Sequence, residues 1–257
     1  MPARLRIARR GGSIITILVL GLGLLLLARL IERPLYGQAR PVTPWITVGV
    51  CRLSLRILGL SRTVRGDAMD RPGGQVANHV SWLDVLVLNA TAPVHFVAKA
   101  EVAGWAGIGH LARATGTVFI ARRRGEAAKH GAMLRDRLRL RQRLLFFPEG
   151  TSTDGLRVLP FKTTLFAAFL GGDLPKGISV QPVALRYHAP RGRDRAFYGW
   201  WGDMDLGSHL IRMLAVRRHG RVVVTYGSAL DAGAFGGDRK ALARTAEAAV
   251  REAFDTP

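Results

Sequence analysis

The chain has 257 residues, with 38 lysines and arginines against 18 acidic residues, a net charge of +20, and 48% hydrophobic residues. This combination excludes an intrinsically disordered chain, because disorder pairs high charge with low hydrophobicity. The positive charge indicates a polyanionic partner, either nucleic acid or an anionic membrane surface. The single cysteine, Cys51, excludes an intrachain disulfide and a multi-cysteine metal site.

The first apolar segment, residues 11–28 ("GGSIITILVLGLGLLLLA"), is 18 residues long and carries no charge. Its length is at the lower end for a transmembrane helix. The sequence that follows, "LARLIERP", offers no small-residue cleavage site, so we interpret the segment as a retained anchor rather than a cleaved signal. Arginines flank it on both sides, at Arg4, Arg6, Arg9, Arg10, Arg29 and Arg33.

A second apolar segment, residues 44–60, contains Arg52 and Arg56 four positions apart, hence on one helical face. An arginine at the bilayer centre costs about 2.5–3.5 kcal/mol, which argues against a second full span. Two interpretations remain open: a helix lying in the membrane interface, or an amphipathic helix packed on the soluble domain. We assign residues 1–62 to a membrane anchor with an interfacial amphipathic helix, and residues 63–257 to the domain that follows.

After Gly66, short apolar β-branched runs alternate with helical stretches. Strands are predicted at 75–78, 94–98, 117–121, 144–147, 179–185 and 221–227, and helices at 125–143, 161–170 and 239–254. Such alternation is typical of a sheet covered by helices on both faces. The predicted fold class is α/β, with a mixed, largely parallel sheet flanked by helices and preceded by the membrane-anchoring segment.

The stretch "VANHVSWLDVLVL", residues 76–88, places His79 and Asp84 between two apolar runs. Ser81 followed by Asp84 fits a capping box at the start of a helix, which is a purely structural explanation for the carboxylate. His79, before the cap, is free to turn back toward Asp84. A carboxylate on one imidazole nitrogen fixes the tautomer and leaves the other nitrogen available as a base.

Two further loops are predicted at the same end of the sheet. Residues 146–155 ("FFPEGTSTDG") follow a buried strand, and Gly150 there exposes backbone N–H groups that suit an anion or an oxyanion. Residues 116–124 ("GTVFIARRR") end in three arginines beginning at Arg122. Arginine forks suit phosphate or carboxylate, although a run of charges is also typical of a solvated face.

Several other functions are excluded by the pattern. The arginines of residues 135–143 spread around a helix, and no nucleic-acid-binding signature accompanies them. The segment "GIGHLA" at 107–112 lacks the acidic residue that a dinucleotide site requires. The seven histidines show no spacing of metal ligands. We therefore expect no nucleic acid, no metal and no cofactor, and keep a non-catalytic membrane-lipid-binding protein as the alternative of a different class.

Four blocks in chain order carry a family resemblance: "NHVSWLD" (78–84), "FVAKAEVAGWAGIGHLARATGTVFIARR" (96–123), "FPEGTSTDGLRVLPFKTTLF" (147–166) and "VQPVAL" (180–185). On these blocks the chain resembles the lysophospholipid acyltransferases of the glycerol-phosphate type, including bacterial 1-acylglycerol-3-phosphate acyltransferases. The resemblance implies transfer of an acyl group to a lysolipid hydroxyl, with acyl carrier protein or coenzyme A carrying the acyl donor. The expected acceptor is 1-acyl-sn-glycerol-3-phosphate, giving phosphatidic acid.

The resemblance also implies roles for individual residues. His79 is the expected general base and Asp84 orients it, while backbone N–H groups of the 149–151 loop hold the oxyanion. The acceptor is expected to contact Lys99, Arg122, Glu149, Gly150 and Thr151. Anionic membrane lipids are the expected partners. We expect the protein in the inner membrane, with a re-entrant N-terminal segment that keeps the catalytic domain on the cytoplasmic side.

One position departs from the family pattern. The third block of the family reads Glu-Gly-Thr-Arg, and the arginine helps to bind the acceptor phosphate, whereas this chain has Ser152 at that place. A hydroxyl supplies no charge to a phosphate. An alternative acceptor is therefore lyso-ornithine lipid, whose acyltransferases resemble the same family.

Overall fold

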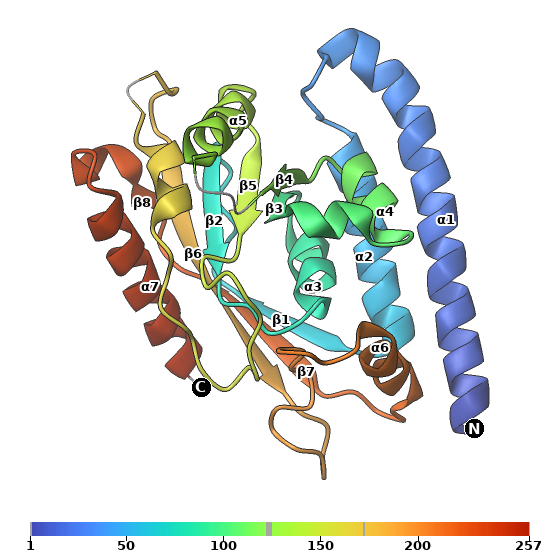
Figure 1. The fold of residues 1–257 in the computed structure, drawn as a ribbon. Coiled ribbons are helices and arrows are strands. Elements are labelled where there is room, and N and C mark those ends of the chain that lie inside the picture. The colour runs from blue at the N-terminus through green and yellow to red at the C-terminus, as the bar shows by residue number, and fades with distance from the viewer. Residues whose placement is uncertain (1, 122–124, 172, 257) are drawn as a thin grey trace.

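The computed structural model describes residues 2–121, 125–171 and 173–256 and contains an eight-stranded sheet (Figure 1). Its strands are β1 (Ser61–Arg65), β2 (Gly73–Ala77), β3 (His95–Lys99), β4 (Val118–Ile120), β5 (Arg143–Phe146), β6 (Ser179–His188), β7 (Arg221–Tyr226) and β8 (Leu230–Asp231). The order is β1-β7-β6-β2-β5-β3-β4, with β8 paired to β6. All pairings are parallel except β6–β7 and β6–β8. This confirms the predicted mixed, largely parallel sheet.

Strand β2 lies at the centre of the sheet, between β6 and β5, and all five of its residues are buried. Successive side chains of a strand point to opposite faces. Val76 accordingly joins the apolar cluster on one face, and Ala77 joins the cluster on the other. The apolar pair Val76–Ala77 at its end is the part that the sequence revealed.

Helices cover both faces of the sheet (Figure 1). The α-helices are α1 (Ala3–Tyr36), α2 (Thr43–Leu58), α3 (Leu83–Thr91), α4 (Ile108–Ala114), α5 (Ala127–Arg139), α6 (Leu206–Ala215) and α7 (Arg239–Asp255). Short 3-10 helices occur at η1 (Ala100–Gly104), η2 (Thr164–Phe169) and η3 (Ala232–Phe235). One core cluster joins α2, α3 and α6 to the sheet, and the other joins α5, η2 and α7 to its opposite face.

Helix α1 is 34 residues long and, within the described part of the chain, is the one helix long and apolar enough to cross a membrane. Only 6% of the most apolar 18-residue stretch of this helix is buried in the structure. Its apolar surface is therefore available to lipid, which fits the predicted anchor. Gly21 lies so close to Val50 of α2 that an added Cβ would approach the valine methyl to 2.3 Å. The two helices thus form a tight antiparallel hairpin (Figure 1).

Helix α2 packs on the α/β domain, as the second of the two interpretations predicted. Cys51, Leu55 and Leu58 belong to the same core cluster as the sheet residues, and Arg52 Nε donates to the Ala90 carbonyl of α3 at 2.9 Å. Arg56 remains exposed. Strand β1 starts at Ser61, and the proposed boundary between residues 62 and 63 stays a prediction.

Two predicted helices differ from the structure. The segment predicted as a helix at 161–170 forms only the short η2, because its first residues are held outside a helix: the Phe161 N–H donates to Glu247 and the Lys162 N–H to the Pro148 carbonyl. The helix predicted at 125–143 stops at Arg139, and its last residue, Arg143, instead begins β5. Strands β1 and β8 and helices α4 and α6 were not predicted.

Candidate active site

Asn78 fixes the point at which β2 ends and the site begins. Its side chain is fully buried. Asn78 Nδ2 donates to the Leu185 carbonyl at 2.9 Å, and its Oδ1 accepts from the Leu185 N–H at 2.7 Å. The amide group therefore continues the ladder between β2 and β6 by one residue. This anchor places His79 at the carboxyl edge of the sheet, where sites form in open α/β proteins.

His79 and Asp84 are paired as predicted. His79 Nδ1–H donates to Asp84 Oδ2 at 2.7 Å, the carboxylate is fully buried, and the imidazole is 20% exposed. The same Oδ2 accepts from the N–H groups of Val80 and Ser81 at 2.7 and 3.0 Å. Asp84 thus serves the start of α3 and the histidine together. Since Nδ1 carries the proton, Nε2 is the imidazole nitrogen with a lone pair to accept one.

Tyr187 supplies a third member of this group, which sequence reasoning missed. Its hydroxyl donates to Asp84 Oδ1 at 2.8 Å, so both carboxylate oxygens accept hydrogen bonds. Tyr187 is in β6, two residues after Leu185, and projects to the same face of the sheet. Burial, followed by the charge of Asp84, raises the pKa of Tyr187 well above its ordinary value, so the phenol keeps its donor proton.

The loop after β5 forms hydrogen bonds with both the N–H and the carbonyl of His79. Glu149 Oε1 accepts from the His79 N–H at 2.7 Å, while its Oε2 accepts from the Leu159 N–H at 2.9 Å. The His79 carbonyl accepts from Thr153 N and Oγ1 at 2.9 and 3.1 Å. The Phe147 ring stacks on the imidazole, with centroids 3.9 Å apart. Burial raises the pKa of Glu149 to about 7, although the two N–H donors lower it.

Glu149 is only 2% exposed, and its oxygens face backbone donors. Its contacts make it a brace for His79, while the predicted contact with the acceptor stays a prediction. Gly150 has φ of 74°, the left-handed region that favours glycine, and its N–H donates to the Phe147 carbonyl at 3.0 Å. Thr151 is exposed at the surface beside it. Which N–H groups of this loop hold an oxyanion also stays a prediction.

One of the two predicted basic contacts, Lys99, lies at the end of a strand next to β5. Lys99 is the last residue of β3 and is exposed, at the same edge of the sheet as His79. Arg122 lies outside the described residues. Lys99 thus lies on the side of the site formed by β3.

Two other kinds of chemistry, metal-dependent and thiol-dependent, have little support among the described side chains near His79. Within residues 2–121, 125–171 and 173–256, no three His, Cys, Asp or Glu side chains come together as a metal site would require. Cys51 lies on the buried side of α2, where burial raises the pKa of its thiol to about 12. A thiol of that pKa is not a nucleophile at neutral pH. What remains is a histidine base, oriented by a buried carboxylate, that can remove a proton from a bound hydroxyl group.

Comparisons with known proteins agree with this geometry. Residues 63–186 match the family described as Acyltransferase. The chain is 54% identical over 251 residues to a lyso-ornithine lipid O-acyltransferase of Rhodobacter capsulatus, covering 98% of this chain and 91% of that protein. It is 33% identical to a 1-acyl-sn-glycerol-3-phosphate acyltransferase of Neisseria gonorrhoeae, over 64% of each chain.

The fold is also shared with a solved structure. The crystal structure of the 1-acyl-sn-glycerophosphate acyltransferase from Thermotoga maritima superposes with a TM-score of 0.67 at 19% identity, covering 98% of this chain and 96% of that one. The resemblance predicted from the four sequence blocks is thereby confirmed. The chain is an O-acyltransferase and belongs to the acyltransferase family that includes lyso-ornithine lipid and 1-acyl-sn-glycerol-3-phosphate acyltransferases.

Proposed function

We propose that this enzyme transfers a fatty acyl group from an acyl thioester to the hydroxyl of lyso-ornithine lipid. The observation that carries the choice of acceptor is Ser152, an uncharged residue whose hydroxyl is bonded to protein backbone. The high identity to the Rhodobacter capsulatus protein supports the same choice. The relatives thus favour the alternative acceptor over 1-acyl-sn-glycerol-3-phosphate, which was the first expectation.

The reaction requires one base and a leaving thiol. His79 Nε2 takes the proton of the acceptor hydroxyl as its oxygen attacks the thioester carbonyl carbon. The carbonyl re-forms as the carbon–sulfur bond breaks, and the departing thiolate takes the proton from the imidazolium. Asp84, held by Tyr187, keeps the ring oriented and stabilises its transient positive charge. The products are the diacylated lipid and the free thiol.

Ser152 holds a second segment of the chain, around Trp200, next to His79. Its hydroxyl donates to the carbonyl of Trp200, and the Trp200 N–H donates to the Val80 carbonyl at 3.0 Å, one residue from His79. The Trp200 ring meets Trp105 edge to face, with centroids 6.1 Å apart. The wall of the site at this position is therefore aromatic and neutral. Such a wall offers no cation to a phosphomonoester.

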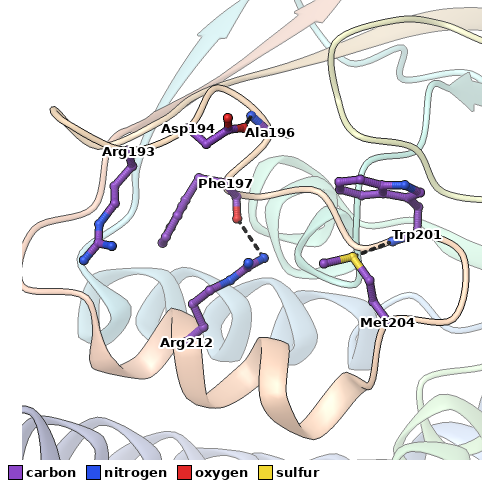
Figure 2. A pocket seen from close by; sticks show the side chains of 7 residues that line it. All are labelled: Arg193, Asp194, Ala196, Phe197, Trp201, Met204 and Arg212. Atoms are coloured by element: carbon purple, nitrogen blue, oxygen red, sulfur yellow. Dashed lines mark hydrogen bonds between the residues drawn. The ribbon is translucent and has the colours of Figure 1, made fainter.

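The outer side of the same segment is braced by α6. A cavity of about 300 Å³ lies between them, lined by Arg193, Asp194, Ala196, Phe197, Trp201, Met204 and Arg212 (Figure 2). Arg212 donates to the Phe197 carbonyl at 3.2 Å, and its guanidinium lies 5.4 Å from the centre of the Phe197 ring. Trp200 Nε1 also donates to the Met204 carbonyl at 2.7 Å, so bonds to Ser152, Val80 and Met204 together hold Trp200 in place, as a preformed acceptor wall requires.

Chemistry and charge support the proposed donor and location. An acyl group on acyl carrier protein or coenzyme A arrives as a water-soluble thioester, while the acceptor stays in the bilayer. The exposed apolar face of α1 and the net charge of +20 suit an anionic membrane surface. We place the protein at the inner membrane, with α1 and α2 as a hairpin that keeps both of its ends, and the catalytic domain, on the cytoplasmic side.

The test compares acceptors on the purified full-length enzyme. Initial rates with labelled acyl–acyl carrier protein and acyl–coenzyme A are measured on lyso-ornithine lipid and on lysophosphatidic acid. Wild type should prefer lyso-ornithine lipid. Ser152→Arg should shift the preference toward lysophosphatidic acid by about ten- to a hundredfold, the size of a charge-assisted hydrogen bond of about 1.5–3 kcal/mol.

Ser152→Ala is the matched control, because it removes the bond to Trp200 without adding a charge. It should slow both reactions alike. A strong wild-type preference for lysophosphatidic acid that Ser152→Arg leaves unchanged would overturn the proposed acceptor, and would mean that another basic residue holds the phosphate.

A further inference from the structure

A second cavity, of about 280 Å³, lies at the opposite end of the sheet from His79. The connector between α1 and α2 forms one side of it, and the first residues of β3 and β5, His95 and Arg143, form another. Strands β2, β3 and β5 run parallel, so their amino ends lie together, away from the carboxyl edge that carries the base. The cavity therefore belongs to neither the catalytic group nor its aromatic wall.

The cavity is basic. Arg40, Arg141 and Arg143 line it, and Arg29 and Arg137 act on Arg40 from nearby. Burial, followed by those two arginines, lowers the pKa of Arg40 to about 10. Two carboxylates oppose this charge in the described structure: Glu32 near Arg40, and Asp70 near Arg143.

Glu32 is already engaged. Its oxygens accept from Arg29 at 3.0 Å and from the N–H groups of Val42 and Thr43 at 2.7 and 3.1 Å, at the start of α2. It closes the α1–α2 hairpin rather than pairing with Arg40. Five arginines against two acids leave the region positively charged, and part of that charge is buried. Charge of this kind is stabilised by an anion.

Two buried nitrogen atoms here lack hydrogen-bond partners among the described residues. They are Arg40 Nε and His95 Nδ1, and His95 is only 5% exposed. Both lie 3.1 Å from the position that a Cβ on Gly116 would occupy. Both atoms therefore lie against the backbone of Gly116, where a side chain would be crowded. Buried polar atoms are almost always bonded, so a pair without partners indicates a place for a ligand or water.

The backbone conformation of Arg141 is also unusual. Its φ is 57°, and within the described ranges it is the one residue other than glycine with a positive φ. Glycine adopts this conformation without strain, whereas arginine does not. The position belongs to the turn that ends α5, where the N–H groups of Arg141 and Gln142 donate to the carbonyls of Leu138 and Arg137. Its exposed side chain lies on the cavity wall.

The residues at the rim of the cavity indicate that the anion belongs to a membrane lipid. Tyr36 and Trp45 line it and are 54% and 57% exposed. They lie at the end of the apolar helix α1 and the start of α2. Tyrosine and tryptophan favour the boundary between lipid and water, and arginine forks suit phosphate oxygens. We propose that this cavity binds the phosphate of an anionic membrane phospholipid and thereby seats the α1–α2 hairpin at the bilayer surface.

The test uses the full-length protein in neutral detergent. Its thermal unfolding is followed with added phosphatidylglycerol, with added phosphatidylcholine, and with inorganic phosphate alone. Phosphatidylglycerol should raise the unfolding midpoint of the wild type, and phosphatidylcholine and inorganic phosphate should not. The double variant Arg40→Gln/Arg141→Gln should lose the shift, and Arg40→Lys/Arg141→Lys should keep part of it.

Arg239→Gln/Arg244→Gln is the matched control. It removes the same charge from the exposed side of α7, which Figure 1 shows on the far side of the molecule from α1. It should keep the full shift. Binding to phosphatidylglycerol vesicles should weaken by about fivefold per cavity arginine removed.

Arg141→Gly keeps the proposal testable if the double variant fails to fold. Glycine fits the backbone at 141, so this variant should unfold at a higher temperature than wild type without lipid, yet gain less from phosphatidylglycerol. An equal loss of the lipid effect in the α7 control would reduce the effect to general charge and overturn the site. An equal shift with inorganic phosphate would overturn its assignment to a lipid.

Discussion

The two ends of the sheet differ in how far the buried polar groups of the described residues are hydrogen-bonded. At the carboxyl end of β2, both oxygens of Asp84 and both backbone groups of His79 are hydrogen-bonded. At the amino ends of β3 and β5, buried nitrogens of Arg40 and His95 have no partner in the described structure. A catalytic base must be held in position before the substrate arrives, whereas a binding cavity leaves its polar atoms for the ligand.

The largest effect is expected at the base itself. His79→Ala should lower kcat by about 10²–10⁴-fold, the range typical of general acid–base catalysis. The side chain makes few contacts beyond Asp84 and Phe147, so the unfolding midpoint should stay near that of wild type. Steady-state rates with lyso-ornithine lipid, alongside circular dichroism, check both statements. A folded His79→Ala protein with near-normal turnover would refute the general-base role.

Asp84→Asn should come next, with a loss in kcat of about 10²-fold. The amide can keep one acceptor oxygen, but its NH₂ group then faces either the donors of His79, Val80 and Ser81 or the hydroxyl of Tyr187. The free energy of unfolding should also fall by about 1–3 kcal/mol, the cost of a buried donor left without an acceptor. Urea denaturation measures this. A fully active, fully stable variant would contradict the assignment.

Glu149→Gln should reduce kcat by about tenfold, because a glutamine oxygen can accept from His79 or Leu159 but not from both. Its pH dependence is distinctive. The pKa of Glu149 is raised to about 7 in the folded protein, so between its ordinary value and 7 the folded state holds a proton that the unfolded chain has lost. This contribution to stability is full below the ordinary pKa and is lost as pH rises through 7.

The stability advantage of wild type over Glu149→Gln should therefore shrink between about pH 5 and about pH 8. Urea midpoints of both proteins at the two pH values test it, with Glu252→Gln on the exposed face of α7 as a control. An advantage that grows with pH would show that the folded protein holds Glu149 ionised.

Tyr187→Phe should have the smallest effect, about threefold in kcat, because Asp84 keeps its other donors when this neutral hydrogen bond is lost. A carboxylate with one donor fewer holds a proton on the imidazole more tightly. The acidic limb of the pH profile of kcat/KM should therefore move to higher pH. An unchanged profile, with only the unfolding midpoint lowered, would reduce Tyr187 to a packing residue.

Much of this site was predictable because it is local in sequence. His79 and Asp84 are five residues apart, and the capping pattern at Ser81 fixes the helix start that brings them together. Tyr187 reaches Asp84 across 103 residues of sequence, and Thr153 reaches His79 across 74. Such contacts depend on which strands become neighbours, and no local pattern reports that.

The fold likewise divides into elements that local sequence predicts and elements that depend on long-range contacts. The central strands β2, β5 and β6 are buried, and β5 and β6 contain clear apolar runs, Leu144–Phe146 and 183–185. Strand β1 lies at the edge of the sheet, four of its five residues are exposed, and its sequence, "SRTVR", has no apolar pattern. Pairing with β7 alone makes it a strand. Tertiary context of this kind overrides weak local propensity.

The central claim is that His79 and Asp84 act as one unit on the acceptor hydroxyl, and a double-mutant cycle tests it most directly. Initial acyl-transfer rates on lyso-ornithine lipid are compared for wild type, His79→Ala, Asp84→Asn and the double variant. If the carboxylate acts only through the imidazole, Asp84→Asn should cost nothing further once His79 is alanine, so the double variant should match His79→Ala. Losses that multiply, as for independent residues, would contradict the account.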